Sequence, residues 1–171
     1  SGGNGARFDV AAVSADNIIA NTARAIATDG AALTASGGFT NTAQATGAIR
    51  ATAVAASLSV GVGSGQVSVT GAGTGAAARN TIGNTVDAGL RAGSTANITG
   101  PVQITARDIG AVTATVTSAS VSIGAGSSQV QASVAVAVSL ATNVLSSSVS
   151  AQIDASRLSA SGAVALRALS N

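Results

Sequence analysis

Two stretches of the chain, GAIRATAVAASLSVGVGSGQ (Gly47–Gln66) and GAVTATVTSASVSIGAGSSQ (Gly110–Gln129), are close copies of one another. They begin 63 residues apart (110 − 47), and 11 of their 20 aligned positions are identical. The same spacing relates three asparagines and a pair of glycines: Asn17, Asn80 and Asn143, and Gly37 and Gly100. An internal period of this kind is typical of a repeat architecture, in which each unit is stabilised by its neighbours.

The repeat predicts a single block over residues 1–171, with units at 1–16 (partial), 17–79, 80–142 and 143–171 (partial). The last copy is one residue shorter, because Gly162 follows Gly100 by 62 positions (162 − 100). Glycine and asparagine tolerate the positive φ that sharp bends require. We therefore predict structural corners at six positions: Asn17, Asn80, Asn143, Gly37, Gly100 and Gly162.

The region Val130–Leu140 shows the local structure of the unit most clearly. Valine, alanine or leucine occupies every even position, and Gln, Ser or Ala occupies every odd one. A period of two indicates a β-strand. Similar strands are predicted at 149–153, 102–104 and 164–168, whereas the alanine-rich region 1–35 could hide a short helical turn. Abundant β-branched and hydroxyl side chains disfavour helix elsewhere.

One sheet of small side chains buries too little surface to fold alone, so we expect successive windings to pair with one another. The sequence predicts an all-β protein, a parallel β-solenoid (β-helix) built from repeats of about 63 residues. Three coils of about 21 residues per repeat are one interpretation, and two larger coils are the alternative. Ile26 and Ala27 fall out of phase and Gly71–Gly75 replaces an apolar strand, which predicts an irregular coil or a protruding loop. Strand faces of Ala, Ser and Gly are expected to line a narrow interior, with lateral packing of fibres as the alternative.

Composition excludes several classes of protein. Charged residues make up 8% of the chain, against about 25% in ordinary domains. A mean hydropathy of +0.48 argues against disorder. The net charge of +2 comes without a basic cluster or stacking aromatics, so no nucleic-acid partner is expected. No run of about 18 apolar residues and no aromatic girdle occurs, so we expect no membrane insertion.

The inventory of reactive side chains argues against catalysis, since the chain has no His, Glu, Lys or Cys. Its acidic residues are scattered over the copies: Asp9, Asp16, Asp29, Asp87, Asp108 and Asp154. We predict no catalytic residue, no metal site and no cofactor. A row at Thr113, Thr115 and Thr117 could order water as ice-binding proteins do, but ordinary strand threonines explain it better because the neighbouring copy lacks the row.

The succession VAVAVSLATNVLSSSVSAQIDASRLSASGAVALRA (Val134–Ala168) resembles the β-strand repeats of giant secreted bacterial adhesins, such as filamentous-haemagglutinin-like and leukotoxin-family surface proteins. The resemblance implies a right-handed parallel β-solenoid, secretion, and a role as a stalk or fibre. It carries over no binding residue. A weaker resemblance links SVSIGAGSS (Ser120–Ser128) to the head repeats of trimeric autotransporter adhesins.

The expected function is therefore that of a structural module in a large extracellular adhesin-like protein at the bacterial cell surface, and not that of an enzyme. Its expected partners are neighbouring repeats of the same chain, with self-association into fibres as an extension. The alternatives are a solenoid module that binds carbohydrate or a host surface and a polysaccharide-active β-helix enzyme. The first lacks the aromatic residues typical of ligand sites, and the second requires a clustered pair of aspartates.

Overall fold

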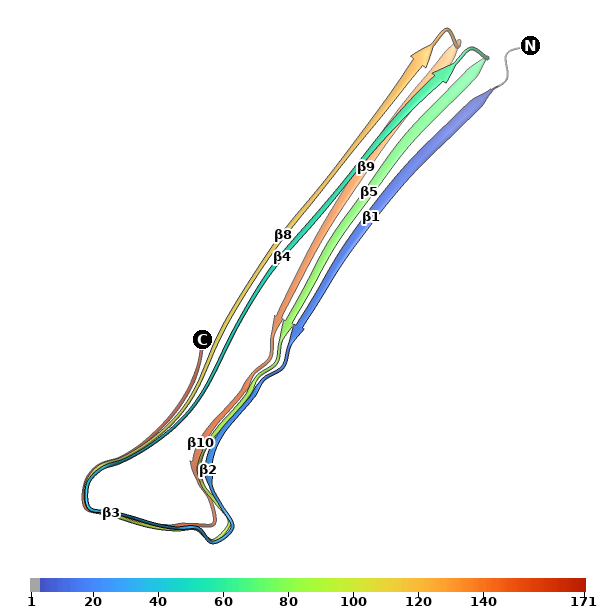
Figure 1. Ribbon diagram of the computed structural model, residues 1–171. Helices are drawn as coiled ribbons and strands as arrows, with labels where there is room; N and C mark the ends of the chain where they lie inside the picture. The colour runs from blue at the N-terminus through green and yellow to red at the C-terminus, as the bar shows by residue number, and fades with distance from the viewer. Residues whose placement is uncertain (1–3) are drawn as a thin grey trace. The chain divides into compact units, whose positions relative to one another are not determined.

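The structure is a computed structural model that describes residues 4–171, and these residues form twelve strands and no helix (Figure 1). The strands are β1 (Gly5–Ile19), β2 (Thr22–Ala27), β3 (Ala32–Ala35), β4 (Phe39–Gly63), β5 (Val67–Ile82), β6 (Thr85–Leu90), β7 (Thr95–Ile98), β8 (Val102–Gly126), β9 (Val130–Leu145), β10 (Ser148–Ile153), β11 (Arg157–Ala160) and β12 (Val164–Ser170). The strands predicted from alternation are confirmed. The helical turn predicted for the region 1–35 is wrong for its described part, because β1 to β3 pair with strands of the next copy and pairing outweighs the helix propensity of alanine.

The strands form four three-stranded sheets, ordered β1-β5-β9, β2-β6-β10, β3-β7-β11 and β4-β8-β12. Every sheet takes one strand from each of three successive copies of the repeat, and the pairing is parallel. Thr85 pairs with Thr22 and with Ser148, 63 positions away on either side (85 − 22, 148 − 85). Arg157 pairs with Thr95 at 62 positions, after the one-residue deletion.

This register corrects the predicted number of coils. Three coils of about 21 residues, or two larger ones, would pair residues within one copy. The observed partners come from successive copies, so both interpretations are wrong. The chain instead makes one winding per copy before it returns to the same sheet. This long winding is possible because small side chains allow long strands to lie close together without a wide core.

Two segments were predicted to interrupt the stacking of the windings, and neither does so. Ile26 and Ala27 pair in register with Gly89 and Leu90. The glycine-rich segment Gly71–Gly75 lies inside β5, between β1 and β9. The predicted irregular coil or protruding loop is therefore wrong, because main-chain hydrogen bonds hold these residues in the sheet whatever their side chains are.

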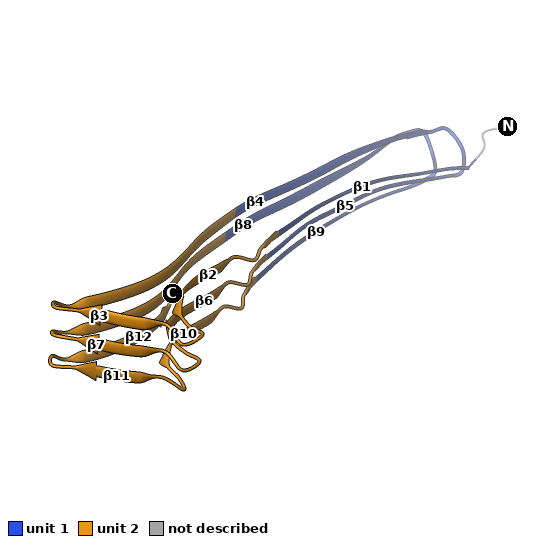
Figure 2. Cartoon of the chain, turned by 60° about the horizontal axis from the view of Figure 1, so that its bottom comes forward, with its two compact units in different colours: residues 1–17, 50–80, 113–143 blue, residues 18–49, 81–112, 144–171 orange. Residues whose placement is uncertain are grey.

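The chain divides into two compact units, each built from three separate segments (Figure 2). Unit 1 contains residues 1–17, 50–80 and 113–143, and unit 2 contains residues 18–49, 81–112 and 144–171. The buried apolar residues of unit 1 are alanines, with Val116 packed against them: Ala51, Ala53, Ala55, Ala72, Ala76 and Ala78. Unit 2 encloses larger side chains between its sheets, including Val86, Leu90, Ile98, Val102 and Ile104. Stacked windings of β3, β7 and β11 are visible in unit 2 in Figure 2.

In unit 2, a repeated turn joins β2 to β3, β6 to β7 and β10 to β11. The second residue after the first strand of each pair has a positive φ: 57° at Asp29, 53° at Ala92 and 46° at Ala155. The Gly30 amide donates to the Ala92 carbonyl at 3.0 Å, and the Gly93 amide donates to the Ala155 carbonyl at 2.7 Å. The hydrogen-bond ladder thus continues through the turn as well as through the strands.

Candidate functional site

Unit 1 contains a ladder of asparagine side chains at the positions that repeat every 63 residues. The Nδ2 of Asn17 donates to the Oδ1 of Asn80, and the Nδ2 of Asn80 donates to the Oδ1 of Asn143, both at 2.9 Å. Asn80 has no exposure to solvent. Because a buried amide without partners is costly, this ladder favours the register that stacks equivalent residues.

The structure places the six predicted corner residues in two kinds of position. Asn17, Asn80 and Asn143 lie within β1, β5 and β9, since their amides bond to one another inside the unit. The glycines Gly37, Gly100 and Gly162 lie in the bends that follow β3, β7 and β11. A Cβ on Gly100 would lie 2.9 Å from the carbonyl carbon of Gly37. Consecutive windings therefore approach too closely at this bend for any side chain.

A second buried polar group lies in unit 2. The Oδ1 of Asn84 accepts from the backbone amide of Asn21 at 3.1 Å, and its Nδ2 donates to Asp108 at 2.6 Å. Asn84 and Asp108 are both almost fully buried. Asp108 is therefore bonded within the fold and is poorly placed to react with a ligand from solvent.

The remaining acidic residues show no shared site. The Asp87 carboxylate forms an ion pair with Arg91 at 2.6 Å. The residue paired with Asp87 on the neighbouring strand β2 is Arg24. In unit 1, the inward-facing Ser59 hydroxyl and the Arg7 guanidinium lower the pKa of Asp9 below its ordinary value. Within residues 4–171, no group of three or more acidic, histidine or cysteine side chains is close enough to bind a metal ion.

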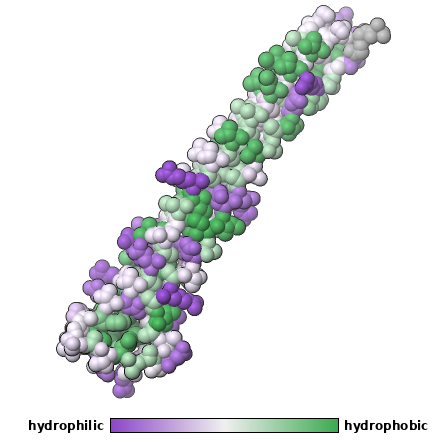
Figure 3. All heavy atoms as spheres, in the orientation of Figure 1, coloured by the Kyte–Doolittle hydropathy of each residue, from purple (hydrophilic) through white to green (hydrophobic). Residues whose placement is uncertain are grey.

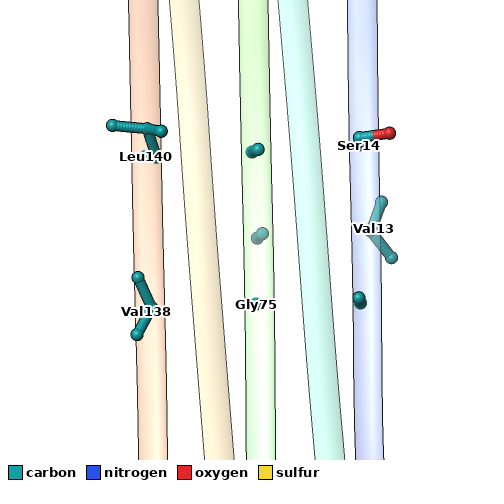
Figure 4. A pocket seen from close by; sticks show the side chains of 8 residues that line it. Val13, Ser14, Gly75, Val138 and Leu140 are labelled. Carbon is teal, nitrogen blue, oxygen red and sulfur yellow. The ribbon is translucent and has the colours of Figure 1, made fainter.

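The outer face of the β1-β5-β9 sheet in unit 1 carries an apolar groove. On β5 the outward positions are Gly71, Gly73 and Gly75, and hydrophobic residues of β1 and β9 rise on either side. One hollow of about 260 Å³ is lined by residues that include Phe8, Val10, Val134 and Val136. A second hollow of about 380 Å³ is lined by Ala12, Gly75, Val138, Leu140 and their neighbours. In Figure 4, Gly75 has no side chain and lies between the side chains of the two flanking strands.

The glycines make this groove. A Cβ on Gly71 would collide with the Phe8 ring, which lies across that glycine, whereas a Cβ on Gly75 would meet nothing within 4 Å. Phe8 and Val10 are 68% and 81% exposed. The sequence of Gly71–Gly75 by itself indicates only that an apolar strand is missing. Its alternate glycines, aligned with valines one copy later, were the available signal for a groove.

Unit 1 also reverses the usual distribution of side-chain sizes. Small residues such as Ala53, Ser59 and Thr70 face its interior and are buried, while Val54, Leu58 and Val62 of β4 point outward and are exposed. The small-residue faces thus line the interior, as predicted. Hydrophobic side chains consequently appear on the surface of this part of the chain (Figure 3). An exposed apolar surface of this kind often marks a contact with another molecule.

No protein-family model, curated protein or solved structure matches the chain. Residues 4–171 include no helix that is long and apolar enough to cross a membrane.

Proposed function

We propose that this chain is a structural repeat module, a segment of the stalk, fibre or surface filament of a large extracellular bacterial adhesin-like protein. In this proposal the module forms a right-handed β-solenoid of about 63-residue repeats and catalyses no reaction. Its function is to form a long, stiff segment through backbone pairing between windings.

The observation that carries the proposal is the stacking of equivalent residues in parallel register. Thr22, Thr85 and Ser148 are aligned in one sheet, and Asn17, Asn80 and Asn143 form one side-chain ladder. Each winding satisfies the hydrogen bonds of the next, so further copies can be added without a new core. A stalk needs this property, whereas an enzyme needs a cluster of reactive groups.

Electron microscopy of chains lengthened by further copies of residues 80–142 tests the proposal. Each winding should add about 4.8 Å, so about twenty extra copies should lengthen the particle by roughly 95 Å at constant width. Lengthened chains that form separate globules, or that grow in width instead, would contradict it.

A binding module is the second candidate, and the groove over β5 is the observation that favours it. Its floor of glycines and its walls of valine and Phe8 suit an apolar ligand or the apolar face of a sugar. A glycan array probed with the chain and with Gly75→Val, which fills the larger of the two hollows described, tests this candidate for that hollow. Binding that the substitution abolishes would support it, and no binding by either protein would count against it.

A further inference from the structure

The outer face of the β1-β5-β9 sheet in unit 1 presents hydrophobic side chains to solvent. On β9, Val134, Val136 and Val138 are 56%, 53% and 58% exposed. β9 carries no charged residue, and the outward positions of β5 from Val67 to Ala77 carry none either. Further windings would extend this face and would not cover it, because windings pair through the edges of their strands. An exposed apolar face of this kind is typical of a contact with another molecule.

The register between β5 and β9 follows from their main-chain hydrogen bonds. In the neighbouring sheet, Thr85 is paired with Thr22, and its amide donates to the carbonyl of Asn21, 64 positions earlier (85 − 21). The Val130 amide of β9 donates to the Gln66 carbonyl at 3.0 Å with the same step of 64 positions (130 − 66). Each residue of β9 is therefore paired with the residue of β5 that lies 63 positions earlier.

This register sets a row of valines beside a row of glycines. Val136 lies beside Gly73 and Val138 lies beside Gly75, and Figure 4 shows the second of these pairs. A Cβ on Gly73 would meet only Val10, at 3.7 Å, and a Cβ on Gly75 would meet nothing within 4 Å. Each valine therefore projects next to an open space at the same level along the strands.

Two such faces fit together about a two-fold axis that runs parallel to the strands, midway between β5 and β9. This rotation places β9 of each copy over β5 of the other and leaves the level along the strands unchanged. Every projecting valine then meets the open space of its own level in the other copy. A two-fold axis across the strands would instead place β5 over β5 and leave the spaces above the glycines empty. The first arrangement is isologous, since both copies use the same patch.

We propose that this face binds the same face of a second copy of the chain, with the strands of the two copies parallel. Val136 and Val138 of each copy occupy the spaces above Gly73 and Gly75 of the other. Gly71 takes no part, because the Phe8 ring already lies across it. The inference goes beyond the proposed stalk function, and it names a second copy instead of a sugar as the occupant of the groove.

The size of the face sets the strength of this dimer. The part of β5 in unit 1 runs from Val67 to Asn80, 14 residues (80 − 67 + 1). It is about 46 Å long, and two strands are about 10 Å wide, so β5 and β9 supply about 450 Å² in each copy and about 900 Å² in total. A stable, specific interface buries at least about 1,000 Å². We therefore expect a weak, reversible dimer.

Sedimentation velocity over a series of concentrations tests the dimer. The unsubstituted chain should convert reversibly from monomer to dimer and form nothing larger, because each face is covered by its partner. Val136→Asp places a charge in the apolar contact, and Gly75→Val fills the space that receives Val138. Each substitution should raise the Kd about tenfold or more.

Val121→Asp is the matched control. Val121 is 50% exposed, against 53% for Val136, but it lies on β8 in a different sheet. The control introduces the same charge at a similarly exposed valine and should leave the Kd unchanged.

A spin label tests the direction of the two copies. Thr142→Cys gives the chain a single cysteine, at an exposed position of β9 that lies six residues beyond Val136 (142 − 136). In the parallel dimer, the nitroxides of the two copies lie at the same end of the contact, less than about 20 Å apart. In an antiparallel dimer centred on Val136, they would lie about 40 Å apart. Double electron–electron resonance measures this separation.

Three results would overturn the proposal: a chain that stays monomeric up to about 1 mM, equal weakening of the dimer by Val121→Asp and Val136→Asp, or labels about 40 Å apart. Should Val136→Asp fail to fold, Gly75→Val decides, since it is expected to stabilise the sheet and must still weaken the dimer. A monomer that binds glycans in the groove would refute the dimer and support the binding module. Stalks formed by lengthened chains of a monomeric protein would refute the dimer and leave the proposed stalk function intact.

Discussion

At the scale of single residues, the Asn80 side chain connects three windings of unit 1. It is fully buried, and its amide bonds to Asn17 on one side and Asn143 on the other. Asn80→Ala removes both bonds and leaves the neighbouring amides without their partner. We expect the free energy of unfolding to fall by about 1–3 kcal/mol, measured by urea denaturation.

Asn143→Ala is the matched control, because Asn143 is exposed and takes part in one bond of this ladder. Its effect should be less than half that of Asn80→Ala. Equal effects of the two substitutions would show that burial of the ladder does not contribute to stability.

Ala92 adopts the left-handed backbone region that alanine disfavours, with φ at 53°. The equivalent residue of the first copy is Asp29, and Asp and Asn tolerate this region better. Ala92→Asn should therefore raise the free energy of unfolding by about 0.5–1 kcal/mol in thermal or urea denaturation. Ala111→Asn, at an exposed position in β8, should bring no gain.

At the scale of elements, two glycines in strands should respond to substitution in opposite ways. Gly75 in β5 has open space where a Cβ would lie, so Gly75→Val should stabilise the sheet by up to about 1 kcal/mol. Gly89 in β6 has the Gln152 carbonyl at that position, so Gly89→Ala should destabilise by about 1–3 kcal/mol. Denaturation of both variants checks the pair, and an equal response would contradict the described packing.

Strand positions could be predicted from the sequence because alternation survives in it. Val130–Leu140 alternates with period two and lies in β9, and the 63-residue spacing of Asn17, Asn80 and Asn143 appears as a bonded ladder. The number of coils could not be predicted. Alternation indicates a strand but does not say which strand pairs with it. β4 runs for 25 residues, which is longer than a whole coil of about 21 residues.

The groove over β5 was also beyond sequence analysis. Three glycines in β5 mark a groove only when β1 and β9 are known to flank them. Strand order follows from pairing between distant segments. Alternation in one segment contains no such information.

At the scale of the whole molecule, the two units should differ in local stability. Unit 2 buries Val, Leu and Ile side chains, each worth about 1.5–3 kcal/mol, whereas unit 1 buries mainly alanine. We expect amide hydrogen exchange to be faster in residues 67–80 of unit 1 than in residues 85–106 of unit 2, since local opening requires less energy where less apolar surface is buried. Uniform protection would contradict this expectation.

Parallel pairing of residues one copy apart is the central claim, and cysteine cross-linking tests it most directly because the chain has no cysteine of its own. Thr34 and Asn97 are register partners on adjacent strands. Their Cα atoms should lie about 4.8 Å apart, within reach of a disulfide. On oxidation, the double variant Thr34→Cys/Asn97→Cys should form an intramolecular disulfide detectable by peptide mass mapping. Thr34→Cys/Thr95→Cys, two residues out of register, should form little or none. Equal cross-linking in the two variants, or none in the first, would contradict the account.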